Sequence, residues 1–415
     1  EAAIGIDDSF YRVGGDSISA IRLLVLCREA GFELRISDLN NTSTIRSQAA
    51  RALSDDVISA PGTTTQYAPF DSFDEETVQR LKDNVVPGIG LSWDSISDVA
   101  PATPLQRGLI SETLRSDGGD AYVTWKITSF GSDMDAERLR RSLVQLVGSR
   151  SIMRTRFALD PILGVVQVVL KEQVGEELVP AVEYCTSASE VKARATAVSQ
   201  DQRWGRPQTS PLHIQIISAQ GEATSMVWFS HHALHDGWSF SVMEQEWRQL
   251  YDADGEKPIS TIGVDVPFTN VSRYLAGRDN EDDLNFWKTY LADAEPVRLA
   301  SGSTSGPPPP DANAQKTITH TTKCDLSSVA RACAVPPSTV FLFALATALG
   351  LFADSDDISF GLILSGRTLP VDDIARVIGP CINTAICRVR LQQTQSAATA
   401  LQQLQADLDE INERG

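Results

Sequence analysis

Residues 225–251 contain the pattern that most restricts how this chain folds. An apolar run, SMVWFSHH, has the character of a β-strand, and the following SFSVMEQEWRQLY has apolar residues at helical spacing. Between them lies HHALHDG, in which three of the chain's five histidines and an aspartate are crowded together. The sequence therefore predicts a strand–turn–helix corner, a place where reactive side chains are common.

Length and composition predict a multidomain globular protein. The chain has 415 residues, of which 42% are hydrophobic and 22% are charged, and this exceeds one typical domain. Its formal net charge of −18 argues against a nucleic-acid partner, which needs a cationic surface. Six scattered cysteines without a C-x-x-C pair favour a reducing, cytoplasmic setting. The apolar run 339–353 is shorter than the ~20 residues of a membrane span and predicts a core helix capped by Ser338.

The patterns along the chain change near residues 54 and 93. Residues 1–54 have helical spacing throughout, and the polar, Pro- and Gly-containing stretch that follows predicts a linker. From about residue 93 the patterns are those of mixed α/β structure. Strands are expected at 121–130, 212–218, 225–232 and 357–366, and helices at 134–150, 239–251, 281–294 and 339–353.

A short motif, GGDSI at residues 14–18, carries a second set of polar groups. The two glycines free the backbone. Asp16 and Ser17 suit a helix N-terminus, which favours an anion such as a phosphodiester. By itself the motif is better explained as a loop followed by a helix cap.

The histidine corner allows three interpretations: a metal site, a structural corner, or a base for acyl transfer. His231 and His232 are adjacent at a strand end, so their side chains point to opposite faces, and no Cys or Glu completes a zinc pattern. We therefore expect no metal. A histidine is mostly neutral near pH 7 and accepts a proton there, which favours the base.

Together these stretches resemble one family. HHALHDGWS resembles the HHxxxDG signature of condensation domains of nonribosomal peptide synthetases, and GGDSI resembles the phosphopantetheine attachment site of their carrier domains. HHALHDGWS and GPCINT look more like fungal than bacterial members. Further stretches are similar to family motifs in the family's order. These are TPLQRGLI (103–110), SIMRTRF (151–157), LNFWKTYL (284–291), GLILSGR (361–367) and VIGPCINT (377–384).

The resemblance implies a multidomain fold. An all-α, four-helix carrier bundle would occupy residues 1–54 without most of its first helix, followed by a linker at 55–92. A two-lobed α/β condensation domain of chloramphenicol-acetyltransferase type would follow, with lobes at 93–265 and 266–415, the second ending early. The lobes would meet in a V with the histidine corner midway along a tunnel.

The resemblance also implies roles for individual residues. Ser17 would carry 4′-phosphopantetheine. His232 would contact the attacking amine, and the N–H of Gly237 would face the developing oxyanion. Asp236 would have a structural role, with Arg367 as its expected partner. His231 would be a packed structural neighbour. His235, Ser239 and Asn383 are expected at the tunnel or the substrate.

The implied activity is peptide-bond formation, in which a donor acyl or peptidyl thioester passes to the amine of a carrier-bound acceptor. The expected partners are an upstream adenylation domain, a downstream carrier domain and a phosphopantetheinyl transferase. A terminal cyclising or ester-forming domain and a non-catalytic docking platform are the alternatives. An epimerization domain is disfavoured, because its usual Trp after the motif's Ser is here Phe240.

Overall fold

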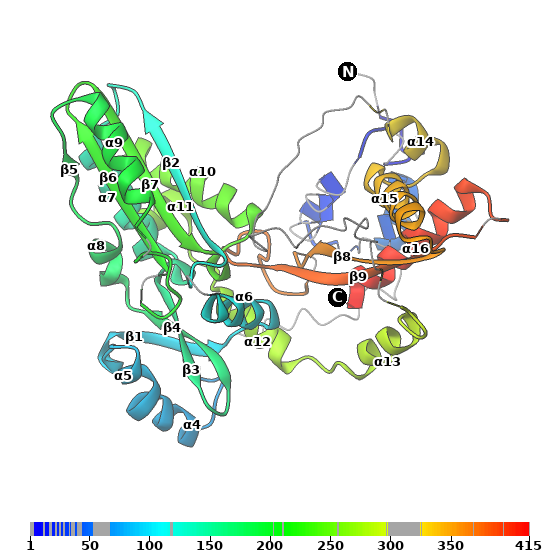
Figure 1. The fold of residues 1–415 in the computed structure, drawn as a ribbon, viewed down its shortest axis with the longest axis horizontal. Helices are drawn as coiled ribbons and strands as arrows, with labels where there is room; N and C mark the ends of the chain where they lie inside the picture. Colours follow the sequence, from blue (N-terminus) through cyan, green and yellow to red (C-terminus); the bar gives the residue numbers. More distant parts are fainter. Residues whose placement is uncertain are drawn as a thin grey trace, which may run out of the picture. The chain divides into compact units, whose positions relative to one another are not determined.

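A computed structural model of the chain forms two compact units, each of which contains separate stretches of sequence (Figure 1). The first unit comprises residues 1–61, 279–368 and 383–415, and the second comprises 62–278 and 369–382. The structure describes residues 67–116, 119–201, 203–209, 211–254, 257–295, 297, 324, 326–367, 369–392 and 394–414, and parts of 4–52.

The second unit is built around a four-stranded sheet in the order β2-β7-β6-β5. Neighbouring strands are antiparallel except the short β5, which pairs in parallel with β6. Helices α7 and α10 pack on one face of the sheet, and α9 packs on the other. The bounds are β2 Val123–Phe130, β5 Glu183–Tyr184, β6 Leu212–Ala219, β7 Ala223–His231, α7 Ala136–Ser149, α9 Ala188–Ser199 and α10 Gly237–Ala253.

Alternation along β7 explains why its sequence is apolar almost throughout. Met226 and Trp228 pack in the core with α7 and α10, whereas Val227 and Phe229 pack with α9. A strand that is buried on both faces needs apolar side chains at successive positions. The predicted strand 225–232 and helix 239–251 are therefore confirmed, with small shifts of their ends.

A second sheet of the same unit has the order β1-β4-β3 and is antiparallel. Apolar side chains from two helical segments, η2 and α5, are buried in its core. These segments, and α4 before them, lie within the predicted linker 55–92. The bounds are α4 Glu75–Arg80, η2 Leu81–Val85, α5 Val86–Gly88, β1 Ile96–Pro101, β3 Thr155–Asp160 and β4 Gly164–Leu170. The remaining helices of the unit are η3 Trp93–Ser95, α6 Pro104–Arg115, η4 Ser151–Arg154, η5 Glu172–Val174, α8 Gly175–Leu178, η6 His232–Leu234, α11 Pro258–Ile262 and α12 Phe268–Gly277.

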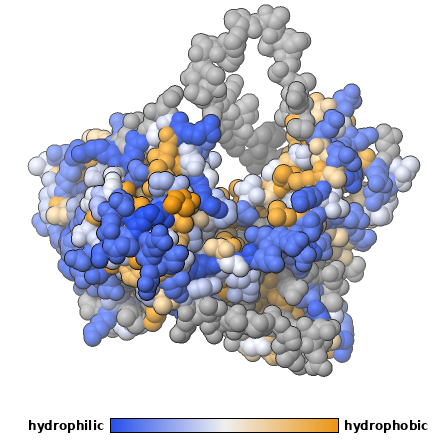
Figure 2. Space-filling model, turned by 90° about the horizontal axis from the view of Figure 1, so that it is seen from below, coloured by the Kyte–Doolittle hydropathy of each residue, from blue (hydrophilic) through white to orange (hydrophobic). Residues whose placement is uncertain are grey.

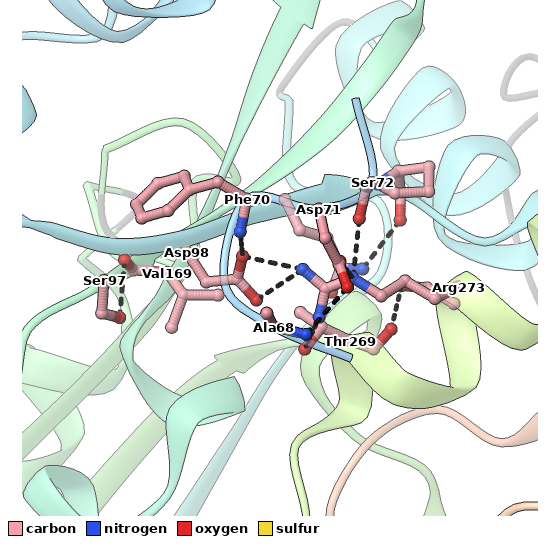
Figure 3. A network of polar contacts seen from close by, with 12 residues as sticks. Ala68, Phe70, Asp71, Ser72, Ser97, Asp98, Val169, Thr269 and Arg273 are labelled. Carbon is pink, nitrogen blue, oxygen red and sulfur yellow. Dashed lines mark hydrogen bonds and ion pairs between the residues drawn. The ribbon is translucent and has the colours of Figure 1, made fainter. Parts of the chain in front are cut away.

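Arg273 on α12 ties the segment before these helices to the sheet (Figure 3). Its guanidinium binds both carboxylate oxygens of Asp98 on β1, at 2.8 and 2.9 Å, and the Ser72 hydroxyl at 2.7 Å. It also lies 3.1 Å from the Asp71 carboxylate, and Tyr67 faces it with its ring centroid at 5.7 Å. Segment 67–72 is therefore fixed to this unit.

The first unit contains the two-stranded sheet β8-β9, with α13, α15 and α16 packed in its apolar clusters. The bounds are α3 Ile45–Ala52, α13 Glu281–Tyr290, α14 Leu326–Cys333, α15 Pro337–Ala353, α16 Ala397–Arg414, β8 Asp357–Ser365 and β9 Ile382–Arg390. Residues Ala20, Leu24 and Leu39 form a small core of their own at the amino-terminal end.

The apolar helix predicted at 339–353 is confirmed, but its cap is not Ser338. Helix α15 begins at Pro337 and its N-cap is Pro336, without a side-chain cap, because proline suits the first helical turn, where no N–H partner is needed. Parts of α15 are exposed, including Leu351 and Phe352, and apolar areas interrupt the mostly hydrophilic surface (Figure 2). No single described helix has the length and apolar character of a membrane span; α14 and α15 meet these criteria only as a pair bent by 106°.

Candidate functional site

The site forms where β7 ends and α10 begins. Strand β7 ends at His231, the single turn η6 covers His232–Leu234, and α10 begins at Gly237. The strand stops because its backbone turns at His232, whose N–H donates to the Tyr122 carbonyl at 2.9 Å. The predicted corner is thus present.

His231 is fully buried and holds the turn together. The Ala233 N–H donates to its Nδ1 at 3.0 Å, so the ring carries its proton on Nε2, 2.8 Å from the Thr113 hydroxyl. Burial, and to a lesser extent the neighbouring His232 and His235, lower the pKa of His231 to about 4. These contacts support the structural role expected for His231.

His232, unlike His231, lines a cavity. Its Nδ1 is shielded from solvent and has no hydrogen-bond partner among the described residues. Its ring stacks on that of His235, with centroids 5.2 Å apart and planes 18° from parallel. The His232 side chain is only partly buried and lines the cavity, so the ring is open to a bound substrate.

His235 lines the same cavity, and a hydrogen bond fixes its ring. Its Nε2 lies 2.7 Å from the Ser230 hydroxyl. Burial lowers the pKa of His235 to about 4, and the nearby His232 acts in the same direction. His235 therefore stays neutral near pH 7 and packs against His232.

Asp236 caps α10 and fastens a distant loop to it. One carboxylate oxygen accepts from the Ser239 N–H and hydroxyl, both at 2.7 Å, and the other accepts from the Cys381 N–H at 3.0 Å. The Ser239 hydroxyl also lies 2.7 Å from the Gly379 carbonyl and accepts from its N–H at 3.0 Å. Loop 369–382 thus joins the helix start through buried, charge-assisted hydrogen bonds.

Ser239 does not line this cavity. We expected it at the tunnel or the substrate, but its side chain is fully buried in the contacts with Asp236 and Gly379 and does not line the cavity. Its role in this unit is to join α10 to loop 369–382.

Arg367 and Asn383 belong to the first unit, whereas Asp236 belongs to the second. Arg367 is buried, and its pairing with Asp236 remains a prediction. Asn383 is exposed, and its side-chain oxygen accepts from the Thr384 N–H at 2.8 Å. Asn383 lies near the start of β9, and its expected substrate role is untested.

The cavity beside the corner has a volume of about 340 Å³. A methyl group added at Gly237 would meet no atom within 4 Å, so the helix start leaves open space there. Among the described residues, no group of three or more His, Cys, Asp or Glu side chains is placed to hold a metal ion. The lining residues are Thr124, Trp125, Lys126, Trp228, Ser230, His232, His235, Asp236, Gly237 and Phe240.

The sequence analysis missed Trp228 as a lining residue. Its indole Nε1 is buried and has no hydrogen-bond partner among the described residues. The signal was present in the strand pattern, because Trp228, Ser230 and His232 alternate along one face. The long apolar run concealed it.

Ser17, the expected attachment residue, lies outside the described residues, but the turn before it is described. Gly14 has a φ of +105°, and a Cβ at Gly15 would lie 2.4 Å from the Phe10 ring. The turn needs glycine at both positions. The role of Ser17 itself stays a prediction.

The fold and the site define an acyltransferase-type enzyme with a carrier domain ahead of it. The family model described as the condensation domain matches residues 96–415, and the one described as the phosphopantetheine attachment site matches residues 1–52. The chain therefore belongs to the condensation domains of nonribosomal peptide synthetases, which form amide bonds together with other synthetase domains. Its cofactor is covalently attached 4′-phosphopantetheine.

Known relatives agree with this assignment. The nonribosomal peptide synthetase dtxS1 of Metarhizium robertsii is 27% identical over 97% of this chain, and ungA of Aspergillus violaceofuscus is 28% identical over 98%. The chain spans only 5% and 4% of their lengths. These and other relatives are fungal, as expected.

Solved structures confirm the fold. The condensation domain of the Monacolin K polyketide synthase MokA has a TM-score of 0.58 at 16% identity and covers 77% of this chain and 74% of its own. The first condensation domain of the calcium-dependent antibiotic synthetase, in complex with a substrate analogue, has a TM-score of 0.53 at 15% identity, covering 77% and 76%.

Proposed function

We propose that this chain joins a donor acyl or peptidyl thioester to the amine of a carrier-bound acceptor, with His232 as the group that acts on the amine. The observation that supports this most directly is the His232 ring, which is only partly buried and lines the cavity. The 4′-phosphopantetheine, bound to Ser17, supplies the thiol that carries the donor.

His232 contributes by position and by proton transfer. The amine attacks the thioester carbon, a C–N bond forms, and the C–S bond breaks. An α-amino group has a pKa near ~8 and is partly neutral at pH 7, so it needs orientation more than a strong base. His232 holds the amine, accepts its proton as the bond forms and returns it to the leaving thiolate.

Gly237 and Asp236 support this step from the start of α10. The N-terminal end of a 17-residue helix favours negative charge, which develops on the thioester oxygen. Asp236 acts through structure, since its carboxylate is occupied by the N–H groups of Ser239 and Cys381.

The proposed reaction also needs other proteins or domains. We infer an adenylation domain that loads the carrier, a downstream carrier that brings the acceptor, and a phosphopantetheinyl transferase that modifies Ser17. The cytoplasmic setting stays a prediction. A docking platform without catalysis would not require a histidine open to the cavity, and His232 is one. The cyclising and ester-forming alternatives differ only in the acceptor.

Two measurements test the proposal. Intact mass after treatment with coenzyme A and a phosphopantetheinyl transferase should rise by one phosphopantetheine, and Ser17→Ala should abolish the gain. Amide formation from a loaded donor and an amine acceptor should fall about 10²–10⁴-fold in His232→Ala.

His213→Phe is the matched control, because His213 is a buried histidine that stacks on Trp204 and lies outside the cavity. The proposal is wrong if His232→Ala and His213→Phe form amide at the same rate. A mass gain that persists in Ser17→Ala would move the attachment site elsewhere.

A further inference from the structure

A second, smaller cavity lies beside the first and shares three wall residues with it. Lys126, Trp228 and Phe240 line both cavities. The smaller one has a volume of about 10 Å³, enough for about one water molecule. Its other lining residues are Thr128, Met226, Met243, Glu244 and Trp247.

Phe240 forms part of the shared wall and is the least enclosed of its aromatic residues. Its ring centroid lies 5.7 Å from those of both His235 and Trp228, and the side chain is only partly buried. The Lys126 ammonium lies 5.1 Å from the same ring and 3.7 Å from the Glu244 carboxylate. About half of the Lys126 side chain is exposed, so this ion pair is weak and yields easily. Rotation of Phe240 would join the two cavities.

The indole of Trp228 supplies a hydrogen-bond donor at this wall. Trp228 is 3% exposed, and its Nε1 has no hydrogen-bond partner among the described residues. A buried donor left unpaired costs free energy and needs an explanation. Indole is a donor only, so the missing partner is an acceptor.

We propose that the joined cavities form a pocket for the side chain of the substrate, with Phe240 as its gate and Trp228 as the residue that reads it. The substrate class is an acyl or aminoacyl group with a large, mainly apolar side chain that carries one hydrogen-bond acceptor. This inference rests on the proposed function, because the pocket opens beside His232.

The lining fits such a side chain. Met226, Met243 and Trp247 are buried at the inner end, and methionine side chains adapt to the shape of what they pack against. The side chain belongs either to the donor or to the acceptor, and both present the same chemistry to the pocket.

The test uses the full chain and three matched side chains: alanine, phenylalanine and 4-pyridylalanine. The last two differ mainly in a ring nitrogen that accepts a hydrogen bond. Each is offered once as the donor thioester and once as the acceptor, so that the role with selectivity identifies the source. Binding of the corresponding non-reactive pantetheine amides is measured in parallel.

We expect the wild type to prefer 4-pyridylalanine to phenylalanine by about 3–10-fold, the effect of one neutral hydrogen bond. Trp228→Phe keeps an aromatic ring but removes the N–H, and it should abolish this preference. If Trp228 has only a structural role, Trp228→Phe should lower the rates with all three substrates by the same factor. A preference that survives in Trp228→Phe overturns its role.

Phe240→Ala and Phe240→Trp test the gate. Burial of a phenyl ring favours phenylalanine over alanine by about 10–100-fold. Phe240→Trp should reduce this ratio by blocking the wall, and Phe240→Ala should extend acceptance to naphthylalanine. Unchanged ratios in both variants overturn the gate. If the amides bind with the expected selectivity but no amide product forms, the pocket stands and the proposed function fails.

Discussion

At the scale of single residues, adjacent histidines have different tasks because the strand ends between them. His231 is fixed by Thr113 and by the Ala233 N–H, whereas His232 lines the cavity. The difference follows from alternation along β7, which was visible in the sequence. The contacts of Asp236 with the Cys381 N–H were not visible, because they join residues 145 positions apart.

The substitution Gly237→Ala should lower the rate of amide formation and leave the stability of the fold nearly unchanged. The added methyl group meets no atom within 4 Å, so the free energy of unfolding should change by less than about 0.5 kcal/mol. The methyl group enters the space where the thioester approaches, and displacement of the reacting atoms by about 1 Å costs about 10²-fold in rate. Amide formation and urea unfolding of the same variant check both statements.

Gly108→Ala is the matched control for this prediction. Gly108 lies inside α6, is exposed, and also has no atom within 4 Å of an added Cβ. The variant should gain up to about 1 kcal/mol from helix propensity and keep its activity. Equal rates in the two variants would remove Gly237 from the site.

At the scale of elements, Arg273 joins α12, β1 and segment 67–72. Its side chain is almost fully buried and is bound on both sides by carboxylates. Removing one partner of a buried ion pair leaves a charge without compensation. The network therefore holds segment 67–72 against β1 and α12.

Arg273→Met should lower the free energy of unfolding by about 3–5 kcal/mol. Arg273→Lys should lose less, because the charge remains and only the two-point contact with Asp98 is lost. Urea unfolding checks this, and Trp93, packed on Phe70 with ring centroids 5.3 Å apart, is a nearby fluorescence probe. The exposed pair of Arg203 and Asp201 is the control, and Arg203→Met should leave the unfolding midpoint unchanged. Equal midpoints for Arg273→Met and the wild type would contradict the prediction.

The sequence predicted elements best where one periodicity continued over a long stretch. Strands β6 and β7 and helices α10 and α15 were expected nearly at their observed bounds. Helices α4 to α5 were missed, because a polar stretch with Pro and Gly precedes and interrupts them. The strand–turn–helix corner was predicted from its motif. The contacts of loop 369–382 with this corner were not predicted, because they join residues that are far apart in the sequence.

At the scale of the whole molecule, loop 369–382 belongs to the unit formed mainly by residues 62–278. The sequence analysis placed a boundary between the two lobes at 265/266. Trp238 donates to the Ala375 carbonyl at 3.0 Å, and Gly379 is too close to Phe268 to carry a Cβ. A later segment thus completes the core of an earlier one. The domain boundaries that we expected remain predictions.

The same unit buries three neutral histidines, and this makes its stability depend on pH. Burial lowers the pKa of His213, His231 and His235 to about 4 each, whereas an unfolded histidine has a pKa of ~6.5. Below pH ~6.5 the unfolded chain binds protons that the folded chain does not, so stability falls as the pH falls and continues to fall until about pH 4. Above pH ~6.5 their contribution is constant.

Between pH 7 and pH 5 each of these histidines should lower the free energy of unfolding by about 2 kcal/mol. Urea unfolding over this range, followed by tryptophan fluorescence, measures the slope. His213→Phe keeps an aromatic ring against Trp204, which stacks on His213 at 3.6 Å, but removes the titrating group. In this variant, the change of unfolding free energy with pH should therefore correspond to the uptake of one proton fewer on unfolding than in the wild type. If the two slopes are equal, His213 is not held neutral by the fold, and the pH dependence has another origin.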